Sequence, residues 1–138
     1  MSQDNIAFRI GPISPAVSGP LYQQIVTGFK REIGEGRLSG NTPLPSFRLL
    51  AEQLLVSVIT VKRAYEELER EGIIYRRQGL GTFVAEDGRK RSRDSKLENA
   101  ETLIQDAIKH ARESGMNPKE VKLFIDQIVT KTLRKKTP

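Results

Sequence analysis

The chain has 138 residues, no cysteine, a net charge of +6 and a pI of about 9.8. The lack of cysteine excludes disulfides and thiolate metal sites, and it fits a reducing, cytoplasmic location. No apolar run approaches the ~20 residues of a membrane span, and the first residues lack the basic and apolar segments of a secretory signal, so we expect no membrane partner. The basic balance favours an anionic partner, and nucleic acid is the usual one.

The positive charge is spread unevenly along the chain. Residues 1–85 carry 10 Lys and Arg against 8 Asp and Glu, whereas residues 86–138 carry 13 against 9. A nucleic-acid-binding face in the first part must therefore be a local patch. Residues 86–96 contain no apolar side chain, which indicates a basic linker or exposed arm and a domain boundary.

Residues 1–20 are rich in glycine and proline and predict a loop, apart from a short edge strand at residues 7–10. A helix is expected to begin at Pro20, where the missing N–H of proline costs little, and to stop near Gly36. Its apolar residues recur every four positions and predict one buried face. They are Leu21, Ile25, Phe29 and Ile33.

The stretch from Leu44 to Val84 has the pattern of two short helices followed by a β-hairpin. Ser46 and Ser57 can cap the helices, because a serine hydroxyl accepts a hydrogen bond from a backbone N–H two or three residues further on. Residues 73–77 and 82–84 are rich in β-forming residues on either side of a glycine-containing turn, which predicts the hairpin. The expected buried residues are Leu50, Ala51 and Leu54 in the first helix, and Val61, Ala64, Tyr65 and Leu68 in the second.

Residues 97–138 have the pattern of two amphipathic helices separated by Gly115. Asn117, Pro118 and Glu120 form a helix start, with a capping residue, a proline at the first helical position and a carboxylate that completes a capping box. A hairpin of about 40 residues is too small to bury both apolar stripes, so we expect it to close against the same hairpin of another subunit. The residues that we assign to this dimerisation are Leu97, Ala100, Ile104, Ala107, Ile108, Val121, Phe124, Ile125, Ile128 and Val129.

The expected fold class is mainly α with a small β wing. A winged helix-turn-helix domain (residues 1–85) is followed by the basic linker (86–96) and by a two-helix dimerisation hairpin (97–138). Such a domain places its second helix in the major groove of double-stranded DNA, where the N-terminal side chains of that helix reach base edges. Glycines in the wing let the backbone approach phosphates or the minor groove closely. The candidate DNA-binding residues are Arg48, Ser57, Val58, Ile59, Thr60, Lys62, Arg63, Arg77, Gly79 and Gly81.

Six short motifs follow one another between Gly19 and Val84. They are Gly19-Pro20-Leu21-Tyr22-x-Gln24-Ile25, Gly36-x-Leu38-x-x-Gly40, Leu44-Pro45-Ser46-x-Arg48-x-Leu50-Ala51, Val56-Ser57-x-x-Thr60-Val61, Ala64-Tyr65-x-x-Leu68-x-x-x-Gly72 and Gly79-x-Gly81-Thr82-Phe83-Val84. With these spacings the stretch resembles the N-terminal domain of GntR-type bacterial transcription regulators. The short two-helix tail resembles that of the YtrA subfamily, where it serves dimerisation.

The resemblance implies DNA contacts by Arg48, by Thr60 and Lys62 on the recognition helix, and by the wing glycines. It also implies a homodimeric repressor that binds an inverted-repeat operator and controls transporter genes. The family usually has arginine directly after the Val-Ser pair, where this chain has Val58. Two interpretations remain open: Val58 and Ile59 meet thymine methyls and alter the specificity, or the affinity for DNA is reduced.

Two other classes of function fit the same pattern. One is a non-specific or architectural DNA-binding protein, and the other is an adaptor that uses the winged helix to bind proteins. An enzyme is not expected, because no nucleophile triad, P-loop or dinucleotide fingerprint occurs. His110 is the only histidine and supports no metal site, so we expect neither metal nor cofactor. Control by a small-molecule effector stays open, because no cluster of polar residues marks a pocket at the dimer interface or between the domains.

Overall fold

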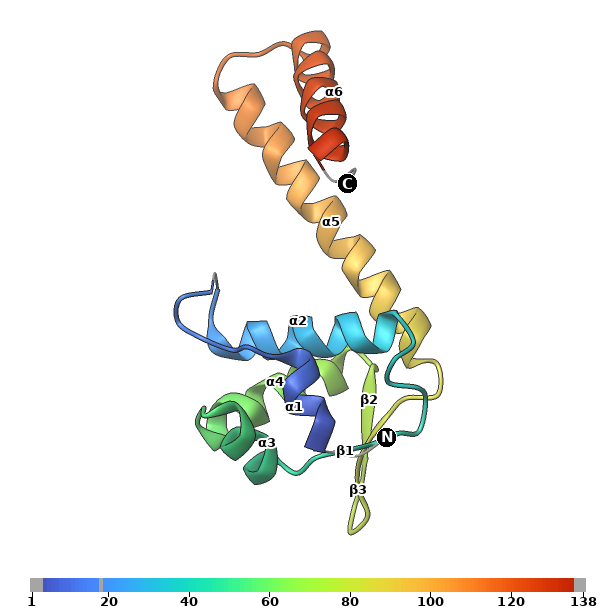
Figure 1. Cartoon of the computed structure of the whole chain (residues 1–138). Helices are drawn as coiled ribbons and strands as arrows, with labels where there is room; N and C mark the ends of the chain where they lie inside the picture. Colours follow the sequence, from blue (N-terminus) through green and yellow to red (C-terminus); the bar gives the residue numbers. More distant parts are fainter. Residues whose placement is uncertain (1–3, 18, 136–138) are drawn as a thin grey trace. The chain divides into compact units, whose positions relative to one another are not determined.

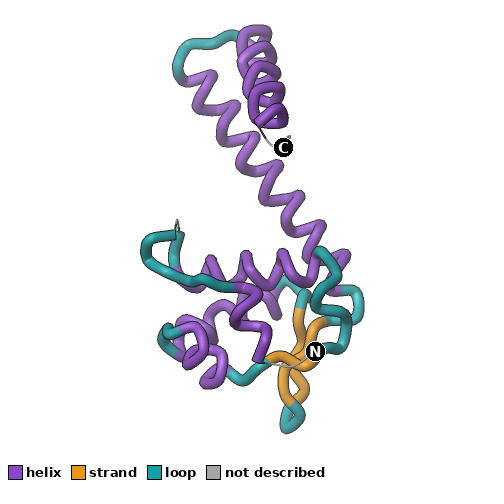
Figure 2. The backbone as a smooth tube through the Cα atoms, viewed as in Figure 1, coloured by secondary structure: helices purple, strands orange, loops and turns teal. Residues whose placement is uncertain are grey.

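The computed structural model describes residues 4–17 and 19–135 (Figure 1). The chain divides into two compact units, Met1–Lys96 and Leu97–Pro138. Helices dominate, and the strands are confined to the first unit (Figure 2), so the predicted fold class is confirmed. The elements in chain order are α1 (Asp4–Ile10), α2 (Leu21–Gly34), β1 (Pro43–Leu44), α3 (Phe47–Leu54), α4 (Val58–Arg70), β2 (Ile74–Arg77), β3 (Gly81–Val84), α5 (Gly88–Glu113) and α6 (Pro118–Lys135).

The core of the first unit lies between α2 and α4. On α2, Ile25, Phe29 and Ile33 are fully buried, as their four-residue spacing predicts, whereas Leu21, the first residue of the predicted face, is half-buried. The facing side of α4 buries its whole predicted stripe, from Val61 to Leu68. This packing leaves the opposite side of α4 exposed to solvent.

Serine caps define the helix-turn-helix as predicted. The Ser46 hydroxyl accepts a hydrogen bond from the Leu49 N–H at 3.2 Å, and the Ser57 hydroxyl accepts one from the Thr60 N–H at 3.1 Å. Each cap satisfies a backbone donor that the first turn of a helix leaves unpaired. Between the two helices, Leu55 adopts a left-handed conformation (φ 59°) that ends α3.

The wing is a three-stranded antiparallel sheet in the order β1-β3-β2. The β2–β3 hairpin is the predicted one, with Ile74 paired to Val84 and Arg77 to Gly81. The third strand, β1, was not expected from the sequence. It pairs Pro43 with Phe83 at the edge of the sheet, a position that proline tolerates because it donates no hydrogen bond to the ladder.

The predicted edge strand at residues 7–10 is wrong, because this segment is part of helix α1. Ile6, Ala7 and Ile10 are buried at helical spacing and pack towards α2. The close approach depends on Gly28, since a Cβ at that position would lie 2.7 Å from the Cβ of Ile10. An α1–α2 contact of this kind carries little signal in the local sequence of α1.

Residues 88–96 differ from the linker or exposed arm that their composition suggests, because they form the first turns of α5. Ser92 and Ser95 are buried in the first unit. The Ser92 hydroxyl donates to the Lys30 carbonyl oxygen at 2.5 Å. The compact unit therefore extends to Lys96 and not to residue 85, while the assignment of the two parts to DNA binding and dimerisation stays a prediction.

The second unit contains the later turns of α5 and all of α6. The predicted capping box is present, since the Glu120 N–H donates to Asn117 Oδ1 and the Asn117 N–H donates to Glu120 Oε1. Of the described residues after Lys96, only Ala111 and Val121 are buried. Within the described ranges, no helix combines the length and the apolar character needed to cross a membrane.

Candidate nucleic-acid interface

The start of α4 exposes an apolar pair. Val58 is 42% exposed and Ile59 is 78% exposed. The half-buried Thr60 turns its hydroxyl to that of Ser57, at 2.7 Å, and the exposed Lys62 follows one turn after Val58. The first turns of α4 thus present two branched apolar side chains and one cation to solvent.

Tyr65 fixes the start of α3 to α4. Its hydroxyl donates to the Pro45 carbonyl oxygen at 2.7 Å, and its ring lies edge-on to Phe47, with 5.2 Å between the ring centroids. Burial raises the pKa of the Tyr65 hydroxyl, so the group remains a protonated donor at neutral pH. Arg48, which is exposed in the first turn of α3, is therefore held in a defined position relative to α4.

A groove of about 570 Å³ lies between the start of α3 and the wing. The guanidinium of Arg76 lies 5.1 Å from the Phe47 ring centroid, which links the wing to the first turn of α3. Figure 1 shows the β2–β3 turn extending away from α2. The groove is lined by Leu44, Pro45, Ser46, Phe47, Leu49, Arg76, Arg77, Gln78, Gly79, Gly81 and Thr82.

The wing turn requires its glycines. Gly79 has φ +79° and Gly81 has φ +120°, a range that side chains with a Cβ rarely adopt. A Cβ at Gly79 would meet nothing within 4 Å, so the backbone at the tip is open to solvent. A flat partner can therefore approach this turn without a side chain in the way.

The structure separates the predicted residues into two groups. Arg77, Gly79 and Gly81 line the groove beside the wing, whereas Arg48 and the residues from Ser57 to Lys62 lie outside its lining, on α3 and at the start of α4. Arg63 contacts α2 instead, because its guanidinium stacks 3.9 Å from the ring centroid of Tyr22.

Sequence analysis left three polar wing residues of the groove out of the candidates. They are Arg76, Gln78 and Thr82. Their position next to Arg77, Gly79 and Gly81 in the hairpin is the signal that could have found them.

The acidic residues of α4 lie towards its C-terminal end. Glu67 pairs with Arg70, and Glu71, the C-cap, pairs with Lys30 of α2 at 3.0 Å. An α-helix rises 1.5 Å per residue, so Glu71 lies roughly 20 Å from Val58 along the axis. The exposed start of α4 therefore lies away from these negative charges.

Across the described part of the chain, no group of three or more His, Asp or Glu side chains could hold a metal ion.

Residues 21–84 match the family described as "Bacterial regulatory proteins, gntR family". Over 116 residues the chain is 32% identical to the HTH-type transcriptional repressor YtrA of Bacillus subtilis. The aligned region covers 84% of this chain and 89% of that protein. The chain belongs to the gntR family. Other curated HTH-type relatives are longer, and the chain spans 14% to 37% of the length of three of them.

Solved structures agree with this family. A GntR family transcriptional regulator from Listeria monocytogenes superposes with a TM-score of 0.61 at 33% identity, over 80% of this chain and 96% of that one. YtrA from Sulfolobus acidocaldarius, a GntR-family transcription factor, gives a TM-score of 0.53 at 30% identity, over 68% of this chain and 98% of that one. The first unit is therefore a winged-helix DNA-binding domain of the GntR type, and the resemblance to YtrA-like regulators is confirmed.

Proposed function

We propose that this GntR-family protein is a homodimeric, sequence-specific repressor that binds an inverted-repeat operator. The observation that carries the proposal is the arrangement of one exposed helix start, one outward arginine and one open wing turn on adjacent elements of the first unit. A protein of this kind acts in the cytoplasm by occupying promoter DNA, so it needs neither catalysis nor a cofactor.

In this proposal the start of α4 enters the major groove. Val58 and Ile59 are branched and exposed, so they contact thymine methyl groups, while Thr60 offers a hydroxyl to a base or phosphate. Ser57 brings the backbone N–H groups of the helix start towards a phosphate. Lys62 and Arg63 add positive charge beside this contact.

Arg48 and the wing supply the flanking contacts. Arg48 is exposed near the N-terminus of α3 and reaches a phosphate. Arg77 and the backbone at Gly79 and Gly81 follow the adjacent minor groove, where the lack of side chains at the glycines permits a close approach. These contacts position the domain, and the start of α4 reads the sequence.

Dimerisation is proposed for the hairpin of the second unit. Its apolar side chains remain largely exposed in the single chain, with Leu97 at 69%, Ile108 at 37% and Phe124 at 40%. Contiguous apolar surface of this kind marks an interface, and a second copy of the hairpin buries it symmetrically. A twofold dimer then presents two α4 helices to two half-sites of an inverted repeat. Transporter genes are the proposed targets, as the resemblance to the YtrA subfamily implies.

The test is fluorescence anisotropy with a duplex from the region upstream of the protein's own operon and a scrambled duplex at the same salt concentration. Specific binding predicts an affinity ratio of at least ~10³ between the two duplexes. The double variant Arg48→Ala, Lys62→Ala should lose most of the affinity, whereas Lys109→Ala, Lys122→Ala, with two exposed cations removed from the hairpin, should not.

Two results favour the other classes of function. Equal affinity and equal salt dependence on both duplexes would identify a non-specific or architectural DNA-binding protein. A wild-type protein without measurable affinity for either duplex would instead point to a protein-binding adaptor.

A further inference from the structure

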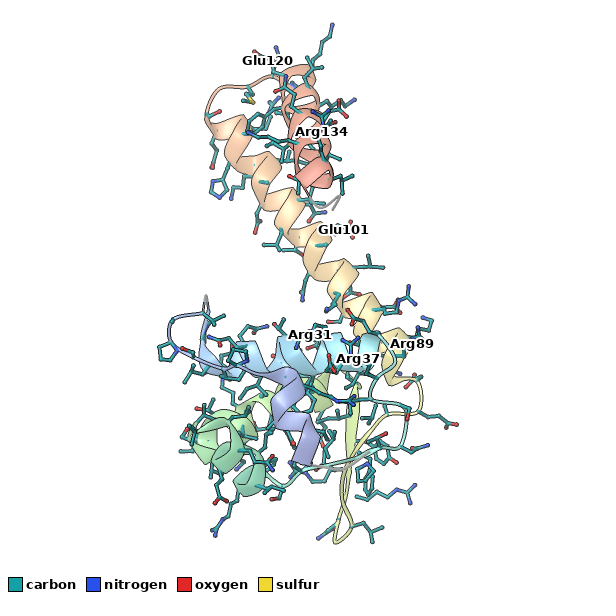
Figure 3. All side chains as sticks on the ribbon, viewed as in Figure 1. Arg31, Arg37, Arg89, Glu101, Glu120 and Arg134 are labelled. Atoms are coloured by element: carbon teal, nitrogen blue, oxygen red, sulfur yellow. The ribbon has the colours of Figure 1, made fainter. Side chains whose placement is uncertain are left out.

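A second groove, separate from the wing, lies in the first unit between the C-terminal half of α2 and the first turns of α5. Its volume is about 440 Å³. Figure 3 shows two of its arginines, Arg31 on α2 and Arg89 on α5. The charged residues that line it are Lys30, Arg31, Glu35, Arg89, Arg93 and Lys96.

The positive charge of this groove is only partly neutralised by acidic residues. Glu35, the one carboxylate in the lining, forms an ion pair with Arg37 outside the groove. Among the described residues, Arg93 and Lys96 have no acidic partner within 4.0 Å. The groove therefore carries an excess of positive charge that favours an anion of more than one charge.

Lys30 gives the groove a fixed wall. The residue is only 4% exposed, and its Nζ donates to Glu71 Oε1 at 3.0 Å and to Ser95 Oγ at 2.7 Å. An ammonium group carries three donors, and in the described part of the chain the third has no partner. The Ser95 hydroxyl donates in turn to Glu71 Oε1 at 2.5 Å, so both ends of the network are held. Lys30 is therefore a fixed group of the groove wall, and its charge is paired with Glu71, so the excess positive charge comes from the arginines and Lys96.

The position of the groove argues against contact with the DNA that α4 reads. Lys30 is joined to Glu71 at the C-terminal end of α4, roughly 20 Å along the helix from Val58. The wing turn, the other DNA-facing element of the proposed function, extends away from α2 (Figure 1). A duplex that lies against Val58 and the wing thus faces another side of the domain.

We infer that this groove is a binding site for a small phosphate-bearing anion, such as a pyrophosphate or phosphate-ester metabolite. Guanidinium groups match phosphate oxygens with two parallel hydrogen bonds, and Arg93 forms no ion pair among the described residues. Arg31 already donates to Glu32 Oε2 at 3.4 Å and to the Arg9 carbonyl oxygen at 2.9 Å, and Arg89 donates to the Gly34 carbonyl oxygen at 3.4 Å, so these two offer their remaining N–H groups. The exposed Lys96 adds another cation to the lining. The site stands whether or not the chain proves to be an operator-specific repressor.

The experiment is calorimetric titration of the full chain with inorganic pyrophosphate at a constant ionic strength of about 0.15 M, which screens non-specific attraction. Wild-type protein should bind one ion per chain. Arg93→Gln, Lys96→Gln removes two exposed cations of the lining and should weaken binding at least ~10-fold, because charge-assisted hydrogen bonds are lost. Lys90→Gln, Lys109→Gln removes two exposed cations of the same helix outside the groove and should leave binding within ~2-fold.

A second measurement does not depend on any variant. Amide chemical shifts of the wild-type chain during the titration should move at Gly34, Glu35 and residues 93–96, and not at the start of α4 or in the wing. The inference fails if saturable binding is absent, if both double variants weaken it equally, or if the shifts fall elsewhere. It also fails if Arg93→Gln, Lys96→Gln weakens DNA binding without pyrophosphate while the control does not, because the groove would then be a DNA contact.

Discussion

Tyr65 shows how one side chain sets the geometry of the proposed DNA-binding surface on α3 and α4. Its ring packs edge-on against Phe29 on α2 as well as Phe47 on α3, and its hydroxyl binds the carbonyl oxygen that precedes Ser46. Three helices therefore share one contact point. The sequence predicts that Tyr65 is buried, but the partner of its hydroxyl, 20 positions away, follows only from the folded chain.

Tyr65→Phe tests this contact. The variant keeps the ring and leaves the buried Pro45 carbonyl without its donor, so the free energy of unfolding should fall by about 1–2 kcal/mol. Urea unfolding followed by circular dichroism measures the change. Tyr22→Phe is the matched control, because its half-buried ring stays available to Arg63 and its hydroxyl has no hydrogen-bond partner among the described residues, and its effect should stay within about 0.5 kcal/mol. Equal losses in the two variants would contradict the role given to the Tyr65 hydroxyl.

Val58 lies at the exposed start of α4, where the resemblance to GntR-type regulators implies arginine. Val58→Arg adds a flexible cation to the exposed start of α4, so affinity for any duplex should rise and the salt dependence should steepen by about one released counterion. Anisotropy titrations between about 50 and 300 mM salt measure this slope. Thr130→Arg adds the same charge on α6 and should leave the slope unchanged. If Val58→Arg behaves like Thr130→Arg, the start of α4 does not lie against phosphates.

At the scale of elements, the first turns of α5 show what a hydrophobic pattern misses. Gly88, Ser92 and Ser95 are buried at helical spacing, so this helix face has the period of a core stripe without any apolar side chain. Hydrogen bonds to Lys30 and Glu71 stabilise it in place of apolar packing. The composition of residues 88–96 therefore predicts a linker, although the small side chains of this segment allow it to pack closely on α2.

The other elements divide into those with a local sequence signal and those that depend on residues far along the chain. Helices with an apolar stripe and a serine cap, such as α3 and α4, were predicted from the sequence, because both signals are local. α1 and β1 were not, since their stability depends on Gly28 and Phe83, partners far along the chain. For the candidate interface, the motifs located the helix start and the wing, but not the stacking of Arg63 on Tyr22.

The network between α2, α4 and α5 makes stability depend on pH. Burial tends to raise the pKa of Glu71, but hydrogen bonds from Ser95 and Lys30 outweigh it and hold the pKa below its ordinary value of 4.5. The carboxylate therefore stabilises the fold at neutral pH. This contribution declines as the pH falls below about 4.5 and is lost as the pH passes through the lowered pKa of the folded state.

Glu71→Gln should consequently lower the melting temperature at pH 7 by several degrees, for a loss of about 1–2 kcal/mol. The gap between wild type and variant should shrink below about pH 4.5, where the wild type also loses its charge. Glu32, whose pKa is lowered by a hydrogen bond from Arg37, is common to both proteins and cancels in the comparison. Glu69→Gln, on an exposed residue of the same helix end, is the control and should follow the wild type at every pH. A gap that stays constant down to pH 3 would mean that the Glu71 charge does not contribute.

At the scale of the whole molecule, the two units bury apolar surface very differently. The first unit has a continuous core of fully buried side chains, whereas the hairpin buries only Ala111 and Val121 among its described residues. Apolar burial is the main favourable term in folding, so a hairpin of this composition is poorly stabilised as a single copy. A second copy of the chain is the partner that we propose for these exposed stripes.

Ile108→Glu together with Phe124→Glu places a charge on each apolar stripe and should convert the dimer to a monomer in light-scattering chromatography, because an unpaired carboxylate is costly to bury. The monomer engages one half-site at a time. Its affinity for an operator with two half-sites should therefore fall by about 100-fold or more, while its affinity for a single half-site should be unchanged. The control is Thr102→Glu with Thr130→Glu, which adds the same two charges on exposed positions outside the stripes. If Ile108→Glu with Phe124→Glu remains a dimer, the interface that we assign to the hairpin is wrong. If circular dichroism shows that this variant has an unfolded first unit, the first unit does not fold independently of the hairpin.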